Sequence, residues 1–357
     1  MSILDKTTAE AATTSGPETL APTQVAPASA PAGVGRRSAV LGFAERYALV
    51  GLLALIVLFF SLYPDSAETF PTRANLNVLL GNQAVTALLA LAVLMPLICG
   101  HFDFSVGAVA ASSSVACAGL MSRHSVSLLL CVLAAVLFGA LVGAVNGLLV
   151  TRFAMSAFVS TLGMATLLGG VIQWYTKGQA ISSNISDSLV SFGSLSWWGV
   201  PRLVYVVAVA LVVLWYLLSQ TPYGRSLYAI GSNPRAAALV GIPVRGYSFL
   251  GFVGAGTLAG VAGVLLAART GGATADSGTA MLFPALAAVF LGATAIQPGR
   301  FNVWGTLVGV LFVSVSVSGL TLAGASDWVN PVFNGLALLL AVALSSLLAS
   351  RRAAGRT

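Results

Sequence analysis

The chain has 357 residues, of which 57% are hydrophobic and only 8% are charged. A soluble domain carries about 25% charged residues, so the composition excludes a chain that mainly faces water. The net charge is +7, but the 17 basic residues are scattered rather than clustered, which excludes a nucleic-acid partner of the usual kind.

The residues that usually build reactive sites are few. Cys99, Cys117 and Cys131 lie in apolar stretches and form no Cys-x-x-Cys pair, so we interpret them as small buried side chains. The two histidines, His101 and His124, fall in separate loops. We predict neither a metal site nor a catalytic centre, and therefore a chain that is not an enzyme.

The N-terminal segment 1–45 differs from everything after it. It is rich in Ala, Pro, Thr and Ser, as in "GPETLAPTQVAPASAPAGVG", and has little apolar surface to bury. Such a composition predicts a disordered cytoplasmic tail. A membrane domain is predicted over 46–350, followed by a short basic cytoplasmic tail at 351–357.

Ten apolar segments are long enough, or nearly so, to span a bilayer, which needs about 20 residues. We therefore predict an all-α, polytopic transmembrane helical bundle of about ten spans. Two segments are weak: 104–121 is rich in Ala and Ser, and 281–296 is short and contains Pro284. Either could be a broken or re-entrant element. The ten segments are 46–63, 77–99, 104–121, 126–150, 155–177, 203–219, 246–268, 281–296, 302–323 and 329–349.

The distribution of basic residues predicts the orientation. With both termini inside, the cytoplasmic segments hold 12 of the 17 basic residues and the outer segments hold five. This is the bias that the positive-inside rule expects for a multi-pass protein of the bacterial inner membrane. The five outer residues are Arg73, Arg123, Lys177, Arg202 and Arg269.

Two absences narrow the function. No Asp or Glu lies within the ten segments, which disfavours a proton-coupled carrier but leaves open a sodium site made of carbonyl and hydroxyl oxygens. The only lysines, Lys6 and Lys177, do not stand in a Gly-Lys-Ser/Thr motif, so the chain lacks a phosphate-binding loop. If ATP powers transport, another polypeptide hydrolyses it.

Uncharged amides occur within the predicted spans. In hydrocarbon an amide without a partner is costly, so each should face protein or a wet cavity. Taken singly, interhelical hydrogen bonds worth about 0.6 kcal/mol explain them. As a set, they suit a path for an uncharged, hydroxyl-rich solute better than a path for an ion. These candidate pathway residues are Asn82, Gln83, Asn146, Gln173 and Asn334.

Small residues recur at four-residue spacing in three spans. Such faces allow helix backbones to approach closely, and we predict that they pack within the bundle. They comprise Gly139, Gly143 and Gly147 in the fourth span, Gly256 and Gly260 in the seventh, and Gly305 and Gly309 in the ninth.

The inner loop 220–245 contains a short helix with clear end signals. Asn233 is a candidate N-cap, Pro234 the first helical residue and Gly241 a left-handed stop. A helix of two turns is marginal in water by itself, so it should dock on something. Its apolar residues Ala237, Leu239 and Val240, with Arg235, fit either a cleft in a soluble ATPase or the lipid surface.

This loop resembles the cytoplasmic coupling loop of the ribose/xylose/arabinose-type ABC transporter permeases, in which a Gly-x-Asn-x-x-Ala-Ala-x-x-x-Gly-Ile pattern precedes a membrane helix. The resemblance implies that the loop couples the chain to an ATPase. The residues assigned to coupling on this basis are Gly231, Asn233, Pro234, Arg235, Ala236, Ala237, Leu239 and Gly241.

Two further segments resemble the same family. "GHFDFSVGA" is similar to its Gly-Gly-Ile-Asp-Leu-Ser-Val-Gly stretch and "AAVFLGATAIQPGRFNVWGTLVG" to a later glycine-rich region. The likeness implies a translocation region containing Asp103, Ser105, Gly107, Gly305 and Thr306. From the residues alone, we also expect Asp103 to cap the inner end of the third span.

The resemblance implies half of a paired permease, as a homodimer or heterodimer, that moves a monosaccharide such as ribose or xylose through the lipid bilayer. It implies a cytosolic ATPase subunit that uses ATP and Mg, and an extracytoplasmic solute-binding protein. Two alternatives stay open: a secondary transporter driven by an ion gradient, and a membrane anchor that transports nothing. The sequence does not identify the solute.

Overall fold

The computed structural model describes residues 36–354. The predicted tail therefore lies largely outside the described residues, as do the last three residues. Two compact units divide the chain, Met1–Leu41 and Gly42–Thr357. Of the first unit the structure describes only the start of helix α1 (Arg36–Leu62), and every other described element belongs to the second unit.

Helix α1 begins ten residues earlier than the first predicted span. The stretch "RRSAVLGFAER" contains no proline, and the last proline before it is Pro31. Nothing in that stretch opposes helical geometry, because Ala, Leu, Glu and Arg are good helix formers. The apolar residues that predicted the first span therefore cover only the later, apolar part of this helix and not its polar beginning.

The fold is all-α, as predicted, and each of the ten predicted segments overlaps one helix. Besides α1, these are α2 (Arg73–Ile98), α3 (Val106–His124), α4 (Leu128–Thr151), α5 (Ala157–Thr176), α7 (Arg202–Gln220), α10 (Val244–Thr270), α11 (Leu282–Gly292), α12 (Val303–Leu322) and α13 (Val329–Ala354). Short elements connect them: α6 (Asp187–Ser194), strands β1 (Ser196–Trp197) and β2 (Val200–Pro201), α8 (Pro222–Ser232), α9 (Pro234–Leu239) and the 3₁₀ helix η1 (Thr279–Met281).

Within residues 36–354, which the structure describes, six helices are long and apolar enough to cross a membrane: α2, α4, α5, α7, α10 and α12. The segment predicted at 281–296 contains a helix of only 11 residues, α11. At 1.5 Å per residue it is about 16 Å long, roughly half the thickness of the hydrocarbon core. A helix of this length cannot cross a bilayer alone, so the short, proline-containing sequence does produce a short element.

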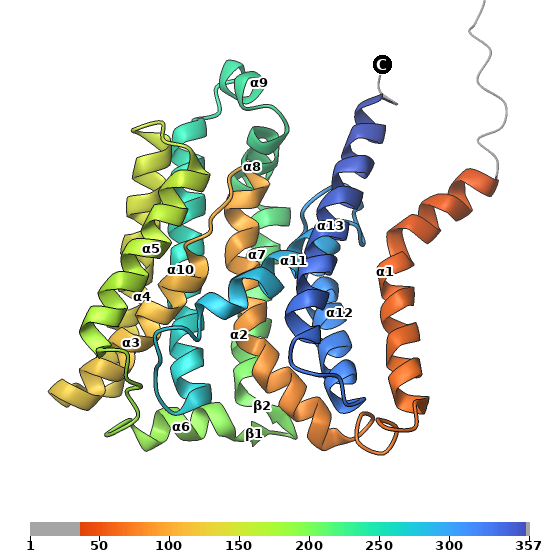
Figure 1. Ribbon diagram of the computed structural model, residues 1–357. Coiled ribbons are helices and arrows are strands. Elements are labelled where there is room, and N and C mark those ends of the chain that lie inside the picture. The colour runs from red at the N-terminus through yellow and green to blue at the C-terminus, as the bar shows by residue number, and fades with distance from the viewer. Residues whose placement is uncertain (1–35, 355–357) are drawn as a thin grey trace, which may run out of the picture. The chain divides into compact units, whose positions relative to one another are not determined.

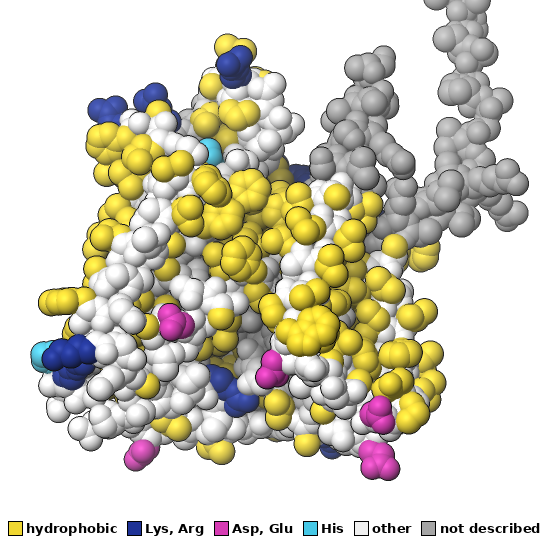
Figure 2. Space-filling view, in the orientation of Figure 1, with side chains coloured by type: hydrophobic (Ala, Val, Ile, Leu, Met, Phe, Trp, Pro, Cys, Tyr) yellow, Lys and Arg dark blue, Asp and Glu magenta, His cyan; other side chains and the backbone are white. Residues whose placement is uncertain are grey.

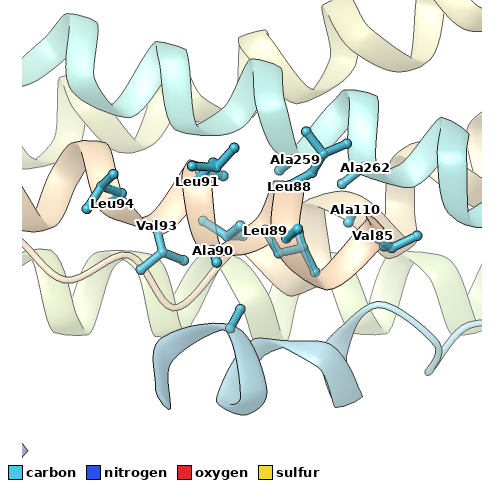
Figure 3. Packing of buried hydrophobic residues seen from close by; sticks show 14 of the residues in the cluster. Val85, Leu88, Leu89, Ala90, Leu91, Val93, Leu94, Ala110, Ala259 and Ala262 are labelled. Carbon is cyan, nitrogen blue, oxygen red and sulfur yellow. The ribbon is translucent and has the colours of Figure 1, made fainter. Parts of the chain in front are cut away.

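Helix α2 forms the centre of the second unit. From Ala84 to Ile98 every residue of α2 is buried, as expected for a helix in the interior of a bundle. It contacts α7, α10, α11 and α12. Figure 3 shows its residues Val85 to Leu94 within the core cluster, together with Ala110 of α3 and with Ala259 and Ala262 of α10.

The glycine faces pack within the bundle, as predicted. A Cβ atom added to Gly143 of α4 would collide with the carbonyl oxygen of Phe252 of α10, and one added to Gly256 would collide with the carbonyl of Gly139. The two glycine faces therefore face each other and bring the α4 and α10 backbones into direct contact. The third face, on α12, packs in the same way against Gly292 at the end of α11.

The two ends of the bundle differ in their connections. Helices α8 and α9 lie at one end, and α6, β1 and β2 lie at the other (Figure 1). In Figure 2 basic side chains are visible over both halves of the face, whereas acidic side chains are visible only over the half opposite α9. The stretch between α2 and α3 and the loop between α11 and α12 both begin at the α9 end (Figure 1).

Candidate functional site

Helix α9 has the end signals that the sequence predicts. The side-chain oxygen of Asn233 accepts hydrogen bonds from the backbone N–H groups of Arg235 and Ala236, over 3.1 and 3.0 Å. Gly241 adopts the left-handed conformation at φ +85° and its N–H donates to the carbonyl of Ala238. The helix ends at Leu239, two residues before Gly241. The cap and stop are confirmed.

The apolar residues of α9 do not share one face. Leu239 and Val240 are 88% and 77% exposed, whereas Ala237 is only 4% exposed. The expectation that Ala237 offers docking surface is therefore wrong. In so short a helix one side necessarily turns toward the rest of the loop, and the carbonyl of Ala237 accepts a hydrogen bond from the N–H of Ile242 there. All residues of α9 except Ala237 are exposed, and so is Val240, which follows the helix.

Helix α8, which precedes α9, is held to the loop before α12. The hydroxyl of Tyr228 donates to the carbonyl oxygen of Phe301 over 2.8 Å. The guanidinium of Arg300 lies 3.8 Å from the centre of the same ring, within the range of a cation–π interaction. Burial raises the pKa of the Tyr228 hydroxyl and the charge of Arg300 acts in the opposite direction. The hydroxyl is therefore a protonated donor at neutral pH.

Asp103 does not cap α3, contrary to the prediction. The residue before the helix is Ser105, whose side chain makes no capping bond. The Asp103 carboxylate instead accepts hydrogen bonds from the N–H of Ser105 over 2.9 Å and from the Ser105 hydroxyl over 2.6 Å. A side chain that bonds two residues ahead forms an Asx turn, which satisfies the carboxylate before it can reach the helix amides. Asp103 is 2% exposed.

The start of α3 is bonded to two other helices, to α4 through Ser105 and to α5 through Phe104. The side-chain N–H of Asn146 on α4 donates to the Ser105 hydroxyl over 2.8 Å, and Asn146 is fully buried. The hydroxyl of Thr161 on α5 accepts from the N–H of Phe104 over 3.1 Å. Three of the predicted residues, Asp103, Ser105 and Asn146, therefore form one buried polar network at the start of α3.

The other predicted amides lie apart from this network. Asn82 accepts a hydrogen bond from the guanidinium of Arg269 over 2.9 Å. Gln173 is exposed, while Gln83 and Asn334 are partly buried. No hydrogen bond joins any two of the five amides within the described part of the chain, and their place on a solute pathway stays a prediction.

The predicted glycines of the translocation region each approach another backbone. A Cβ on Gly107 would press on the carbonyl of Gly278, just before η1, and one on Gly305 would collide with the carbonyl of Gly292. Thr306 donates to the carbonyl of Asn302 over 2.9 Å. These residues serve the close packing of α3 against η1 and of α12 against α11.

Sequence reasoning missed Asn302, which caps α12. Its side-chain oxygen accepts from the N–H of Gly305 over 2.6 Å, and its side-chain N–H donates to the carbonyls of Ala295 and Arg300 over 3.2 and 3.1 Å. An Asn three residues before a helical glycine at the start of an apolar run is a recognisable N-cap signal.

Sequence reasoning also missed a row of phenylalanines. The Phe102 and Phe290 rings stack at 6.0 Å between centroids, and Phe301 meets Phe290 edge-on at 5.4 Å. Phe102 and Phe301 belong to two similar tetrapeptides, "GHFD" and "GRFN", that each precede a helix. Both begin with a left-handed glycine, Gly100 at φ +84° and Gly299 at φ +75°. This repeated motif is the sequence signal from which the two phenylalanines could have been predicted as a pair.

These observations describe a polytopic membrane bundle with a capped helix at one end and interrupted helices inside. Residues 75–342 match the family described as "Branched-chain amino acid transport system / permease component". The match covers more than half of the chain, and the protein therefore belongs to this family of transport permeases.

The individual relatives have names that are more specific than the description of the family. The ribose import permease protein of Escherichia coli (strain K12) is 33% identical over 84% of this chain and 92% of the relative. The ribose import permease protein of Bacillus subtilis (strain 168) is 34% identical over 83% and 90%. The D-allose transport system permease protein of Escherichia coli (strain K12) is 29% identical over 86% and 93%. No solved structure matches the chain.

The family and its apolar helices define the protein as a multi-pass component of the bacterial inner membrane that acts in transport rather than as an enzyme. The resemblance drawn from three sequence motifs is confirmed, since the relatives include sugar permeases across nearly the whole chain.

Proposed function

We propose that this chain is the membrane-spanning permease subunit of an ATP-binding-cassette importer that moves a monosaccharide, such as ribose or xylose, into the cell. The observation that carries the proposal is the identity of 33–34% to two ribose import permeases over more than four fifths of the chain. The ion-gradient alternative is not favoured, because the relatives include chains described as ABC transporter permeases.

The proposed topology has about ten membrane elements with both termini in the cytosol. In this arrangement the α9 end of the bundle is cytosolic. It is supported by the 12 basic residues assigned inside against five outside. In this topology, α11 is a half-length element that completes one crossing together with the preceding stretch 271–281.

The ATPase is proposed to be a separate cytosolic subunit that uses ATP and Mg and docks on α9. Leu239 and Val240 are large apolar side chains at the tip of a short polar loop. Their exposure to water does not stabilise the protein, so we expect a partner to cover them. A helix of one or two turns needs a partner to become rigid, and a cleft in a soluble subunit supplies one. Arg235 beside them adds a positive charge for an acidic rim.

Two further partners belong to the proposal. An extracytoplasmic solute-binding protein delivers the sugar to the end that carries α6, β1 and β2. A second permease copy, identical or not, covers the face on which the loop 271–281 and η1 are partly exposed. Irregular backbone at membrane depth is tolerated only where protein covers it or water reaches it, so lipid is a poor neighbour for this face.

The test is reconstitution of the chain in liposomes with its ATPase and binding protein. We expect uptake of labelled D-ribose, D-xylose or D-allose that requires ATP and all three components. The control is the chain alone under a proton or sodium gradient. Uptake in that control, with no requirement for ATP, would establish the secondary transporter instead.

A further inference from the structure

Helix α8 is anchored firmly in the bundle although it lies outside the predicted spans. Leu227 and Ile230 are fully buried, and α8 contacts α2, α7 and α10. Its other end leads directly into α9, because Asn233 is both the residue after α8 and the cap of α9. A force applied to α9 is therefore passed to a rigid, packed helix rather than to a flexible linker.

One contact of α8 reaches the loop before α12. The hydroxyl of Tyr228 donates to the Phe301 carbonyl over 2.8 Å and the Arg300 guanidinium lies over its ring. The pair fixes the loop at two successive residues, one through the backbone and one through the side chain. The next residue is Asn302, the cap of α12.

A second contact of α8 reaches the stretch before α3. Gly231 lies so close to the end of α2 that an added Cβ would collide with the carbonyl oxygen of Ile98. The chain then continues through Gly100 to Asp103 and the buried network at the start of α3. Helix α8 thus contacts the motif "GRFN" itself and the end of α2 two residues before "GHFD", through residues within one four-residue stretch, 228–231.

The two motifs meet again inside the bundle. Phe102 and Phe301 both pack on Phe290 of α11, at 6.0 and 5.4 Å between ring centroids. Each motif also ends in a side chain that organises the next helix, Asp103 before α3 and Asn302 before α12. Displacement of either loop therefore moves one wall of the same aromatic cluster and the start of one helix.

We propose that α8 is the lever that transmits movement of the ATPase to both helix-start loops together, and that Tyr228 is the positioning residue that engages the α12 loop. This inference rests on the proposed function and adds to it the internal route of coupling. Packing alone requires the Tyr228 ring but not its hydroxyl, whereas the lever requires the bond from that hydroxyl to the Phe301 backbone.

The test is the substitution Tyr228→Phe in the permease assembled with its ATPase and binding protein in liposomes. The ring and its packing are retained, so the complex should assemble. We expect the number of sugars taken up per ATP hydrolysed to fall about five-fold, the factor that corresponds to a net hydrogen bond of ~1 kcal/mol. The substrate is whichever of D-ribose, D-xylose and D-allose the wild-type protein takes up fastest.

The matched control is Tyr216→Phe, on an exposed part of α7, which should leave the ratio unchanged. A second variant, Arg300→Gln, removes the cation–π interaction and should lower the ratio in the same direction. An unchanged ratio in both Tyr228→Phe and Arg300→Gln overturns the lever while wild-type uptake upholds the importer. Absence of ATP-dependent uptake in the wild-type protein overturns the proposed function and the lever with it.

Discussion

The side-chain amide of Asn146 on α4 donates a hydrogen bond of 2.8 Å to the hydroxyl of Ser105, the residue before α3. The two residues lie 41 positions apart, and both are buried. Through the same hydroxyl, Ser105 also donates to the carboxylate of Asp103. The start of α3 is thus fixed to α4 by a chain of buried polar contacts.

Asn146→Leu should destabilise the protein by about 1–2 kcal/mol, because a buried hydrogen bond is lost at similar side-chain volume. Asn146→Asp should be worse, since it places a second carboxylate one hydroxyl away from Asp103. Thermal unfolding of the purified protein in lipid nanodiscs measures both. The control Gln173→Leu replaces an exposed amide and should change little. An Asp variant as stable as the wild type contradicts the network.

Gly143→Leu should destabilise the α4–α10 contact by about 1–3 kcal/mol or more, because the new side chain would run into the Phe252 backbone. The matched control is Gly170→Leu on α5, where no atom lies within 4 Å of an added Cβ. Size-exclusion profiles after heating compare the two variants. Equal losses at both positions would show that the glycine faces do not meet in the membrane.

Asn302→Ala should cost about 1–2 kcal/mol, because α12 loses its N-cap. Asn302→Ser should cost less, since serine can still accept from the N–H of Gly305. Hydrogen exchange of the segment 293–306 is the sharper measurement, and faster exchange confined to this segment is expected. If serine and alanine behave alike, the side-chain oxygen is not what orders the helix start.

Leu239→Asp and Val240→Asp should each weaken binding of the ATPase subunit about ten-fold, equivalent to about 1.4 kcal/mol, with no loss of thermal stability. Both side chains are exposed, so their replacement removes only contacts to a partner. Ala237→Asp should instead lower stability, because it buries a charge. Affinity measured on detergent-purified complexes, with Ala238→Ser as the control, separates the three cases. Unchanged affinity in both exposed variants places the ATPase elsewhere.

Some features of this fold could be predicted because they depend on neighbours in sequence. The ten apolar segments each contain a helix, since apolar runs in a membrane must satisfy their own backbone hydrogen bonds. The cap and stop of α9 were predictable because Asn233 and Gly241 act within three residues of their own positions.

Other predictions were wrong because a second interaction close by in the sequence took the place of the one that we expected. Asp103 was a plausible cap for α3, but the Asx turn with Ser105 is nearer and satisfies the carboxylate first. Ala237 shared the apolar character of Leu239, but a six-residue helix has a side that faces inward, and composition does not say which.

A bundle of apolar helices, free of Asp and Glu in its predicted spans and with a capped helix between the sixth and seventh spans, follows from the order of the amino acids alone. Which surfaces meet became known from the packed helices: the α4 glycines with those of α10, Asn146 with Ser105, and Tyr228 with Phe301. Helix formation and capping are settled within a few residues. Contacts between residues 41 to 73 or more positions apart depend on how whole helices pack, which no local pattern specifies.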